Sequence, residues 1–253
     1  MSKQKRGYRK ANRGRGLSAK AAGKPRPSTP EAFPRYRVWD LPTRISHFLI
    51  AGLFVLLFVT GQFDWLPSVV HLWAGYLLLA VLLFRIHWGF FGAESARFSG
   101  FLAGPRAWMA YLPALLSRRP TLWAGHNPVG GLFVVTVLVL LLALCVTGLF
   151  FESWGEVRGP LAERVSRKLA IGLSDLHDVL RWPVLGLVIV HVAATLGYRM
   201  FKSEDRIGPV FGDGRLELDK PPSLRFVPAA RALWPTLSYL ALTVLLVWLG
   251  RTI

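Results

Sequence analysis

The sequence predicts an all-α membrane protein, in which a four-helix transmembrane bundle is followed by a fifth transmembrane helix. Of the 253 residues, 53% are hydrophobic and only 18% are charged, whereas soluble domains carry about 25% charged residues. Five apolar stretches approach or exceed the length of about 20 residues that a bilayer crossing needs. None of them alternates as barrel strands do. Because backbone groups in lipid must be hydrogen-bonded within their own segment, these stretches are expected to be helices.

The expected spans follow the apolar runs of the chain. Their approximate bounds are 46–63, 69–90, 129–151, 179–199 and 233–250. Between the second and third spans, the sequence PRAWMAYLPALLSRR combines an apolar face with a basic end, which is typical of a short interfacial helix.

Basic residues are concentrated in two segments, and this predicts the orientation. Residues 1–46 carry thirteen Lys and Arg against two acidic residues, and residues 91–128 carry four against one. Because cytoplasmic loops are enriched in Lys and Arg, both segments are expected on the cytoplasmic side. The connection 64–68 has Asp64 and no basic residue, and 151–178 has four basic and five acidic residues. These two segments are expected on the other side of the membrane.

The same charge distribution divides the chain into three parts. Residues 1–35 are predicted to be a basic, disordered cytoplasmic tail, since the first 30 hold ten Lys and Arg and no acidic residue. A tail of this kind could bind nucleic acid, but its place directly before a span favours contact with anionic membrane lipid. Residues 36–215 are expected to form the bundle, and 216–253 a cytoplasmic linker and the fifth helix.

Four of the six histidines are predicted to form two pairs at two depths of the bundle. His177 and His191 are 14 residues apart on one helix, which is about 21 Å along the axis and about 40° short of four full turns. Both rings therefore face nearly the same way. His71 begins the second span at its outer end, and His47 begins the first span at its inner end. The expected pairs are His47 with His191 inside and His71 with His177 outside.

Two pairs of imidazoles at two depths match the axial ligands of two bis-histidine haems, because neutral imidazole binds iron well. Zinc or copper is a weaker alternative, since no carboxylate or thiolate accompanies either pair within the spans. A proton relay would not need matched depths on three helices. The single cysteine, Cys145, excludes a disulfide and a covalent haem attachment of the C-x-x-C-H type within this chain.

Several motifs, in order, give the chain a family resemblance. These are RVWDLPTRISH at 37–47, HLWAGY at 71–76, FRIHWGFFG at 84–92, GHNPVGG at 125–131, the LHDVL and IVHVAA sequences of the fourth span, and RIGPVFGDG at 206–214. Over about residues 36–215 the chain resembles the bacterial cytochrome b561 and nickel–iron hydrogenase b-type cytochrome family. The basic tail, the fifth span and His87 depart from that pattern.

The resemblance implies a four-helix membrane protein of the bacterial inner membrane with two b haems. It implies His47, His71, His177 and His191 as axial ligands, in agreement with the depth argument. It also implies electron transfer between a periplasmic partner and the membrane quinone pool. Bis-histidine iron would have no open position for dioxygen.

Arginines near these histidines are candidates for haem propionates, because guanidinium groups bind carboxylates well. Arg44, Arg85 and Arg199 are expected at the inner ends of their helices, where they are equally well explained as ordinary cytoplasmic-side arginines. Arg181 lies four residues after His177 at the outer end of its helix, where no topology rule asks for an arginine. It is a candidate partner for the outer haem, or for Asp178 or Asp175.

Three functions of different classes remain at this point. The first is a quinone-linked cytochrome that serves a soluble periplasmic cytochrome. The second is the membrane-anchor cytochrome subunit of a hydrogenase or of another multi-subunit reductase or dehydrogenase. The third, less favoured, is a non-redox transporter or scaffold. Whether the chain is an enzyme in its own right or an electron-transfer subunit is left open by the sequence.

Overall fold

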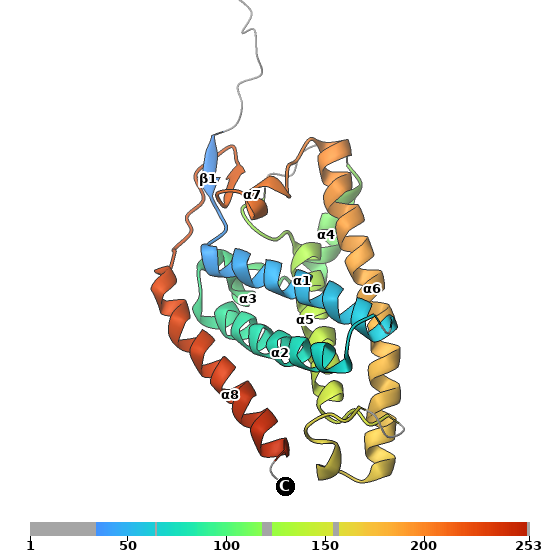
Figure 1. Ribbon diagram of the computed structural model, residues 1–253. Helices are drawn as coiled ribbons and strands as arrows, with labels where there is room; N and C mark the ends of the chain where they lie inside the picture. Colours follow the sequence, from blue (N-terminus) through green and yellow to red (C-terminus); the bar gives the residue numbers. More distant parts are fainter. Residues whose placement is uncertain (1–33, 64, 118–122, 154–156, 252–253) are drawn as a thin grey trace, which may run out of the picture. The chain divides into compact units, whose positions relative to one another are not determined.

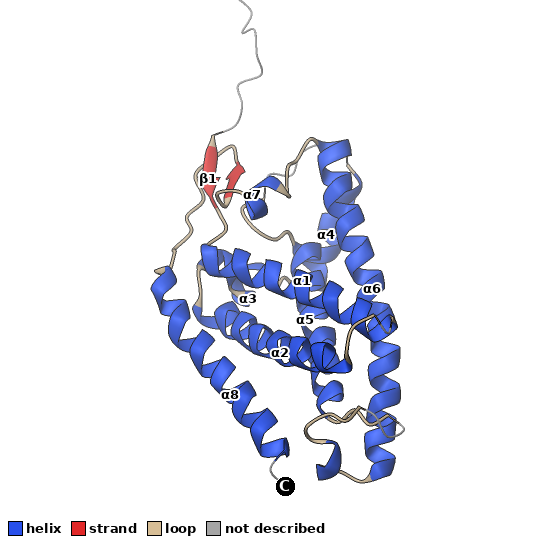
Figure 2. Cartoon of the chain, in the orientation of Figure 1, coloured by secondary structure: helices blue, strands red, loops and turns tan. Residues whose placement is uncertain are grey.

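The computed structural model describes residues 34–63, 65–117, 123–153 and 157–251, so almost all of the expected basic tail, and Asp64, lie outside the described residues. Five helices are long and apolar enough to cross a membrane, as predicted. Figure 2 shows that helix dominates the described chain. The five long helices are α1 (Leu41–Gln62), α2 (Ser68–Phe91), α5 (Pro128–Leu149), α6 (Arg167–Lys202) and α8 (Leu233–Arg251).

Short elements connect the long helices. They are β1 (Arg35–Arg37), η1 (Glu94–Ala96), α3 (Phe98–Phe101), α4 (Pro105–Leu116), η2 (Ala162–Arg164), α7 (Gly208–Phe211), β2 (Arg215–Glu217) and η3 (Ala229–Ala232). The helix α4 falls within the sequence predicted to be interfacial. Its backbone is tied to α6, because Lys202 Nζ donates to the carbonyl oxygen of Ala114 at 2.7 Å.

The core lies where α1, α2, α5 and α6 meet. Close backbone packing joins α1 with α2, α2 with α5, and α5 with α6. The buried side chains at the centre are Phe54, Leu78, Leu82, Leu138, Leu141 and Val184. On α2 and α6 these residues lie between the outer histidine and the inner end of the helix, so an apolar layer separates the two predicted histidine levels.

Helix α6 begins at Arg167, twelve residues before the expected start of its span. The side chain of Ser166 accepts a hydrogen bond from the backbone N–H of Leu169 at 3.4 Å, as an N-cap residue does. The added turns carry charged residues, which apolar periodicity does not detect. In Figure 1 they lie beside the loop that follows α5. His177 is therefore about three turns inside the helix.

The fifth helix, α8, packs against α2. Its Val247 contributes to a buried cluster with Tyr76 and Leu79 of α2. Nearer its start, Tyr239 Oη lies 3.2 Å from Nδ1 of His87, also on α2. Because α2 also packs on α1 and α5, it is the most buried of the long helices.

A small sheet lies at the start of α1. Strands β1 and β2 pair antiparallel, with Tyr36 opposite Leu216. The backbone N–H groups of Val38 and Trp39 both donate to the carbonyl oxygen of Gly214, which adopts a φ of +78°. A positive φ of this size favours glycine. The segment after α6 is thereby held against the entry to α1.

Candidate functional site: two histidine pairs

The four histidines singled out in the sequence meet in two pairs. The ring centroids of His47 on α1 and His191 on α6 lie 6.2 Å apart, and those of His71 on α2 and His177 on α6 lie 6.4 Å apart. In both pairs the two imidazoles come from different helices. Helix α6 supplies one member of each pair, with the spacing of 14 residues noted in the sequence.

The spacing within each pair fits one iron ion held between two imidazoles. A metal–imidazole bond is about 2 Å long. Two imidazole rings that bind one ion from opposite sides therefore have centroids roughly 6 Å apart. In the protein chain alone His47 is exposed and the other three rings are half-buried, which leaves space beside the rings. Helix α6 packs closely on α5, while among the described residues close backbone packing of α6 against α1 or α2 is sparse. A flat macrocycle needs such a separation.

The surrounding donor set also fits iron better than zinc. Among the described residues, no group of three or more His, Cys, Asp or Glu side chains gathers as a metal site would require. A structural zinc site needs four such ligands, whereas a haem iron already has four nitrogen ligands from its porphyrin and needs only two from the protein.

Hydrogen bonds fix the outer pair. His71 Nδ1 lies 2.9 Å from Thr60 Oγ1, and His177 Nδ1 lies 3.2 Å from Thr147 Oγ1 and 3.0 Å from the carbonyl oxygen of Leu144. A carbonyl can only accept, so Nδ1 of His177 carries the proton and Nε2 has the free lone pair. Metal-binding histidines usually donate their second ring nitrogen to such a partner.

Thr60 and Thr147 were missed by sequence reasoning, although a signal was present. Both threonines directly precede a glycine near the end of an apolar helix, in the short sequence Val-Thr-Gly at 59–61 and again at 146–148. That repetition is visible in the sequence. Its meaning depends on knowing which histidine each copy contacts.

Aromatic and cationic groups surround the inner pair. Phe133 of α5 stacks on His191 with centroids 5.2 Å apart and planes 12° apart. Arg85 of α2 is only 6% exposed, and its one side-chain hydrogen bond among the described residues is a long one of 3.5 Å to the carbonyl of Ala96. The carboxylate of Asp40 also acts on this guanidinium, and a buried cation with so few partners would gain from a further anion.

The other arginines occupy three different environments. Arg44 donates through Nε to the carbonyl of Val210 at 2.9 Å, and through a terminal nitrogen to the carbonyl of Gly212. Arg199 is exposed. Arg181 pairs with Asp178 at 3.3 Å and lies over the Trp182 ring. The pairing with Asp178 was one of the alternatives expected from the sequence.

Asp40 is the N-cap residue of α1, but its side chain makes no capping hydrogen bond. Its Oδ2 instead accepts a hydrogen bond of 2.7 Å from Nε1 of Trp88, near the end of α2. Both side chains are almost fully buried. Their separation of 48 positions explains why a local reading of the sequence could not find this contact.

His126 lies between the rings of Trp39 and Phe101, with centroids 4.9 and 4.7 Å away. Burial, and then the nearby charge of Arg85, lower the pKa of His126 to about 3. Its Nδ1 is buried and has no hydrogen-bond partner among the described residues. The ring is therefore neutral at physiological pH. The next residue, Asn127, caps α5, because its Oδ1 accepts from the backbone N–H of Gly130 at 2.7 Å.

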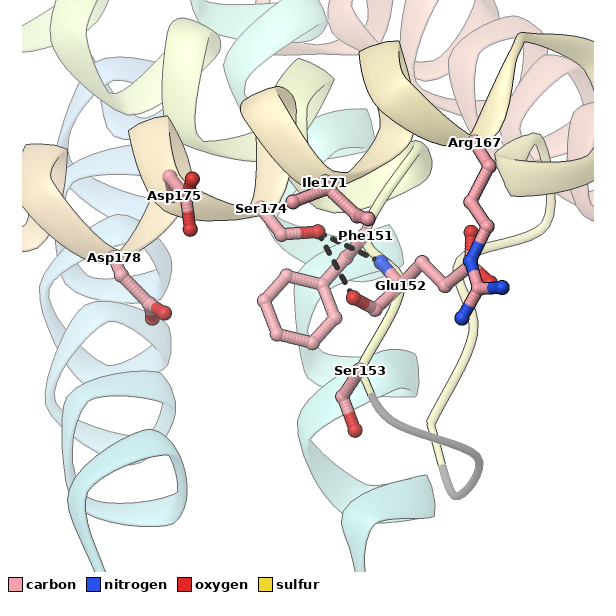
Figure 3. Close-up of a pocket in the computed structure, with 8 residues that line it drawn as sticks. All are labelled: Phe151, Glu152, Ser153, Arg167, Ile171, Ser174, Asp175 and Asp178. Carbon is pink, nitrogen blue, oxygen red and sulfur yellow. Dashed lines mark hydrogen bonds between the residues drawn. The ribbon is translucent and has the colours of Figure 1, made fainter.

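The loop after α5 is tied to α6 near the outer pair. Figure 3 shows Ser174 of α6 hydrogen-bonded to the backbone of Glu152: its Oγ accepts from the N–H at 2.8 Å and lies 3.3 Å from the carbonyl oxygen. The preceding residue, Phe151, packs edge-on against His177 with centroids 5.6 Å apart. These contacts hold the first turns of α6 in place around His177.

Comparison with known proteins gives consistent relatives. The family model for "Prokaryotic cytochrome b561" matches residues 38–213. A protein of Rhizobium leguminosarum bv. viciae is 26% identical over 215 residues, which cover 72% of this chain and 90% of the relative; a protein of Azotobacter vinelandii is 27% identical over 216 residues, covering 73% and 90%. Both are described as "Probable Ni/Fe-hydrogenase B-type cytochrome subunit".

A protein of Escherichia coli K12 described as "Probable Ni/Fe-hydrogenase 1 B-type cytochrome subunit" is 30% identical over 135 residues, covering 41% of this chain and 57% of the relative. No solved structure matches the chain. The family match covers well over half of the sequence and includes all four paired histidines. The chain therefore belongs to the prokaryotic cytochrome b561 family and is a multi-pass membrane cytochrome of the b type.

Proposed function

We propose that the chain binds two haem b groups and transfers electrons between a periplasmic redox partner and the membrane quinone pool. The observation that carries this proposal is the spacing of the imidazoles, 6.2 Å in the inner pair and 6.4 Å in the outer pair. When bound, the two haems would supply reversible one-electron chemistry. His47 and His191 would hold one group, and His71 and His177 the other.

The chain's own residues set the conditions for that chemistry. Two imidazoles on each iron leave no open position, so the proposed function is electron transfer without binding of dioxygen. The apolar layer around Leu82, which is fully buried, keeps water from the region between the levels. Arg44 and Arg181 remain predicted haem-binding residues. Buried Arg85 is a further candidate to bind a propionate of the inner haem.

The orientation is part of the proposal. The Lys and Arg excess of residues 1–46 favours a cytoplasmic N-terminus in the inner membrane. His47 and His191 then lie toward the cytoplasm, and His71 and His177 toward the periplasm. Quinone would react at the inner level and the redox partner at the outer level.

A haem count tests the ligand assignment. A pyridine haemochrome measurement on purified full-length protein should give about two haems per chain, and His177→Ala should give about one, since one bis-imidazole site loses a ligand. His87→Ala is the matched control, because His87 lies on a long helix but contacts Tyr239 rather than another imidazole. An unchanged count in His177→Ala would remove His177 from the ligand set.

The second candidate is the membrane-anchor cytochrome subunit of a hydrogenase or a related metalloenzyme. The descriptions of the relatives as hydrogenase cytochrome subunits favour it. Affinity purification of the tagged chain from mildly solubilised native membranes distinguishes the two. A stoichiometric metalloenzyme subunit would support the anchor role. Quinone-dependent reduction of a soluble cytochrome by the chain alone would support the first proposal.

A further inference from the structure

An eight-residue segment occurs twice in the chain, once at the end of α1 and once at the end of α5. Residues 56–63 read LLFVTGQF and residues 143–150 read ALCVTGLF, so five of the eight positions are identical. The two helices end at equivalent positions of the segment, at Gln62 and Leu149. Each copy therefore presents its Thr-Gly pair in the last turn of a membrane helix.

Each threonine contacts one imidazole of the outer pair. Thr60 Oγ1 lies 2.9 Å from His71 Nδ1, and Thr147 Oγ1 lies 3.2 Å from His177 Nδ1. Each hydroxyl also donates to the carbonyl one turn earlier, at 2.8 Å in both copies. A hydroxyl whose hydrogen is used in this way can only accept from Nδ1–H. Both rings are thereby held with Nε2 as the free ligand atom.

The backbone carbonyl three residues before each threonine completes the arrangement. The carbonyl of Leu144 lies 3.0 Å from His177 Nδ1, and the carbonyl of Leu57, at the corresponding position of the first copy, acts electrostatically on His71. Both copies thus offer a hydroxyl to the ring nitrogen, and in both the carbonyl three residues earlier acts on the same imidazole.

The glycine of each copy gives the imidazole its room. A Cβ added to Gly61 would lie 3.0 Å from Cε1 of His71, and one added to Gly148 would lie 3.2 Å from Cε1 of His177. Both distances are shorter than the 3.5–4.0 Å at which carbon atoms pack best. The threonine therefore orients the ring, and the glycine lets the helix approach it.

We propose that these two segments, 56–63 and 143–150, form a duplicated positioning device for the outer haem, in which Thr60 and Thr147 set its reduction potential. This rests on the proposed function. A hydrogen bond accepted from Nδ1–H raises the basicity of the ligating imidazole, which favours ferric over ferrous iron and lowers the potential. In the described part of the chain neither His47 nor His191 has a hydroxyl partner of this kind, so the effect belongs to the outer level alone.

A redox titration of the full-length, haem-loaded protein in detergent tests the device. The variants are Thr60→Val and Thr147→Val, singly and together, with Thr60→Ser and Thr147→Ser, which keep the hydroxyl. Thr136→Val is the matched control, because Thr136 makes the same bond to a carbonyl one turn earlier, at 3.0 Å, on an exposed face of α5. The component missing in His177→Ala identifies the outer haem.

The valine variants should each shift the outer haem to a higher midpoint potential, and the shifts should add in the double variant. The serine variants and Thr136→Val should stay near the wild-type value, and the inner haem should not move. Loss of the outer haem in the valine variants but not in the serine variants would also support the device, since the hydroxyl alone would then distinguish them.

Two results would overturn it: an unchanged outer potential in the double valine variant with two haems bound, or equal shifts in the serine and valine variants. Either would leave the haem count of the wild type, and so the proposed function, intact. A wild-type protein that binds no haem would instead refute the proposed function itself.

Discussion

Replacing Gly61 with alanine should destabilise the haem-loaded protein, although alanine is the better helix former. The new methyl group would lie 3.0 Å from Cε1 and 3.5 Å from Nδ1 of His71. The ring has little freedom to move away, since its Nδ1 is hydrogen-bonded to Thr60 Oγ1 and its Nε2 would be a ligand of the iron. The clash must be relieved by stretching one of those two bonds or by moving the end of α1.

The size of the effect follows from two opposing terms. Extra carbon that forces a held side chain or the backbone to shift costs about 1–3 kcal/mol, and exchanging glycine for alanine within a helix stabilises by up to about 1 kcal/mol. Gly52 on the same helix has no heavy atom within 4 Å of an added Cβ, so Gly52→Ala has only the favourable term. The two variants should therefore differ by about 1–3 kcal/mol in the free energy of unfolding.

Thermal unfolding in detergent, followed by the Soret absorption of the bound haem, measures this difference. For a chain of this size 1 kcal/mol corresponds to roughly 2–4 °C in Tm. Gly148→Ala should behave like Gly61→Ala with a smaller shift, because its Cβ would lie 3.2 Å from the ring of His177. Equal melting temperatures for Gly61→Ala and Gly52→Ala would refute the proposed close contact between α1 and His71.

Two further predictions concern the end of the bundle where α1 begins. Burial, and then the charge of Arg85, lowers the pKa of His126 to about 3. Between pH 6.5 and 5 the unfolded chain therefore binds a proton at this histidine while the folded chain does not, and the free energy of unfolding falls by about 2 kcal/mol. His126→Asn should lose this part of the pH dependence of Tm, and an unchanged dependence would contradict the assignment. Trp88→Phe should cost about 1.5–3 kcal/mol by leaving Asp40 without its donor, measured by thermal unfolding; Trp108→Phe, whose Nε1 has no partner among the described residues, should cost less.

Much of the helical architecture could be predicted from the sequence, because its causes are local. Apolar runs of sufficient length predict the five membrane helices. The 14-residue spacing of His177 and His191 predicts a shared face from helix geometry alone. The polar turns at the start of α6 could not be found in this way, since they carry no apolar signal.

The contacts around the start of α1 could not be predicted, because they join residues far apart in the chain. Arg44 reaches the carbonyls at the end of α7, 166 and 168 residues later, and Asp40 reaches Trp88. Asp40 and Arg44 are also four residues apart, where they could pair with each other. Only the tertiary packing decides among them, and here it favours the distant partner over the local one.

The two histidine levels have different chemical surroundings, and a 14-residue spacing shared by two helices explains the difference. On α6, 14 residues separate His177 from His191, and on α2 the same 14 residues separate His71 from Arg85. Helix α2 therefore supplies an imidazole at the outer level and a buried cation at the inner level, where the charge of Arg85 acts on His47. The outer rings are held by neutral hydroxyls and carbonyls from α1 and α5. A group bound at the inner level would thus lie near a buried guanidinium, whereas the charges that act on His177 at the outer level are an opposite pair, Asp178 and Arg181. The protein can therefore hold two identical cofactors in different electrostatic environments.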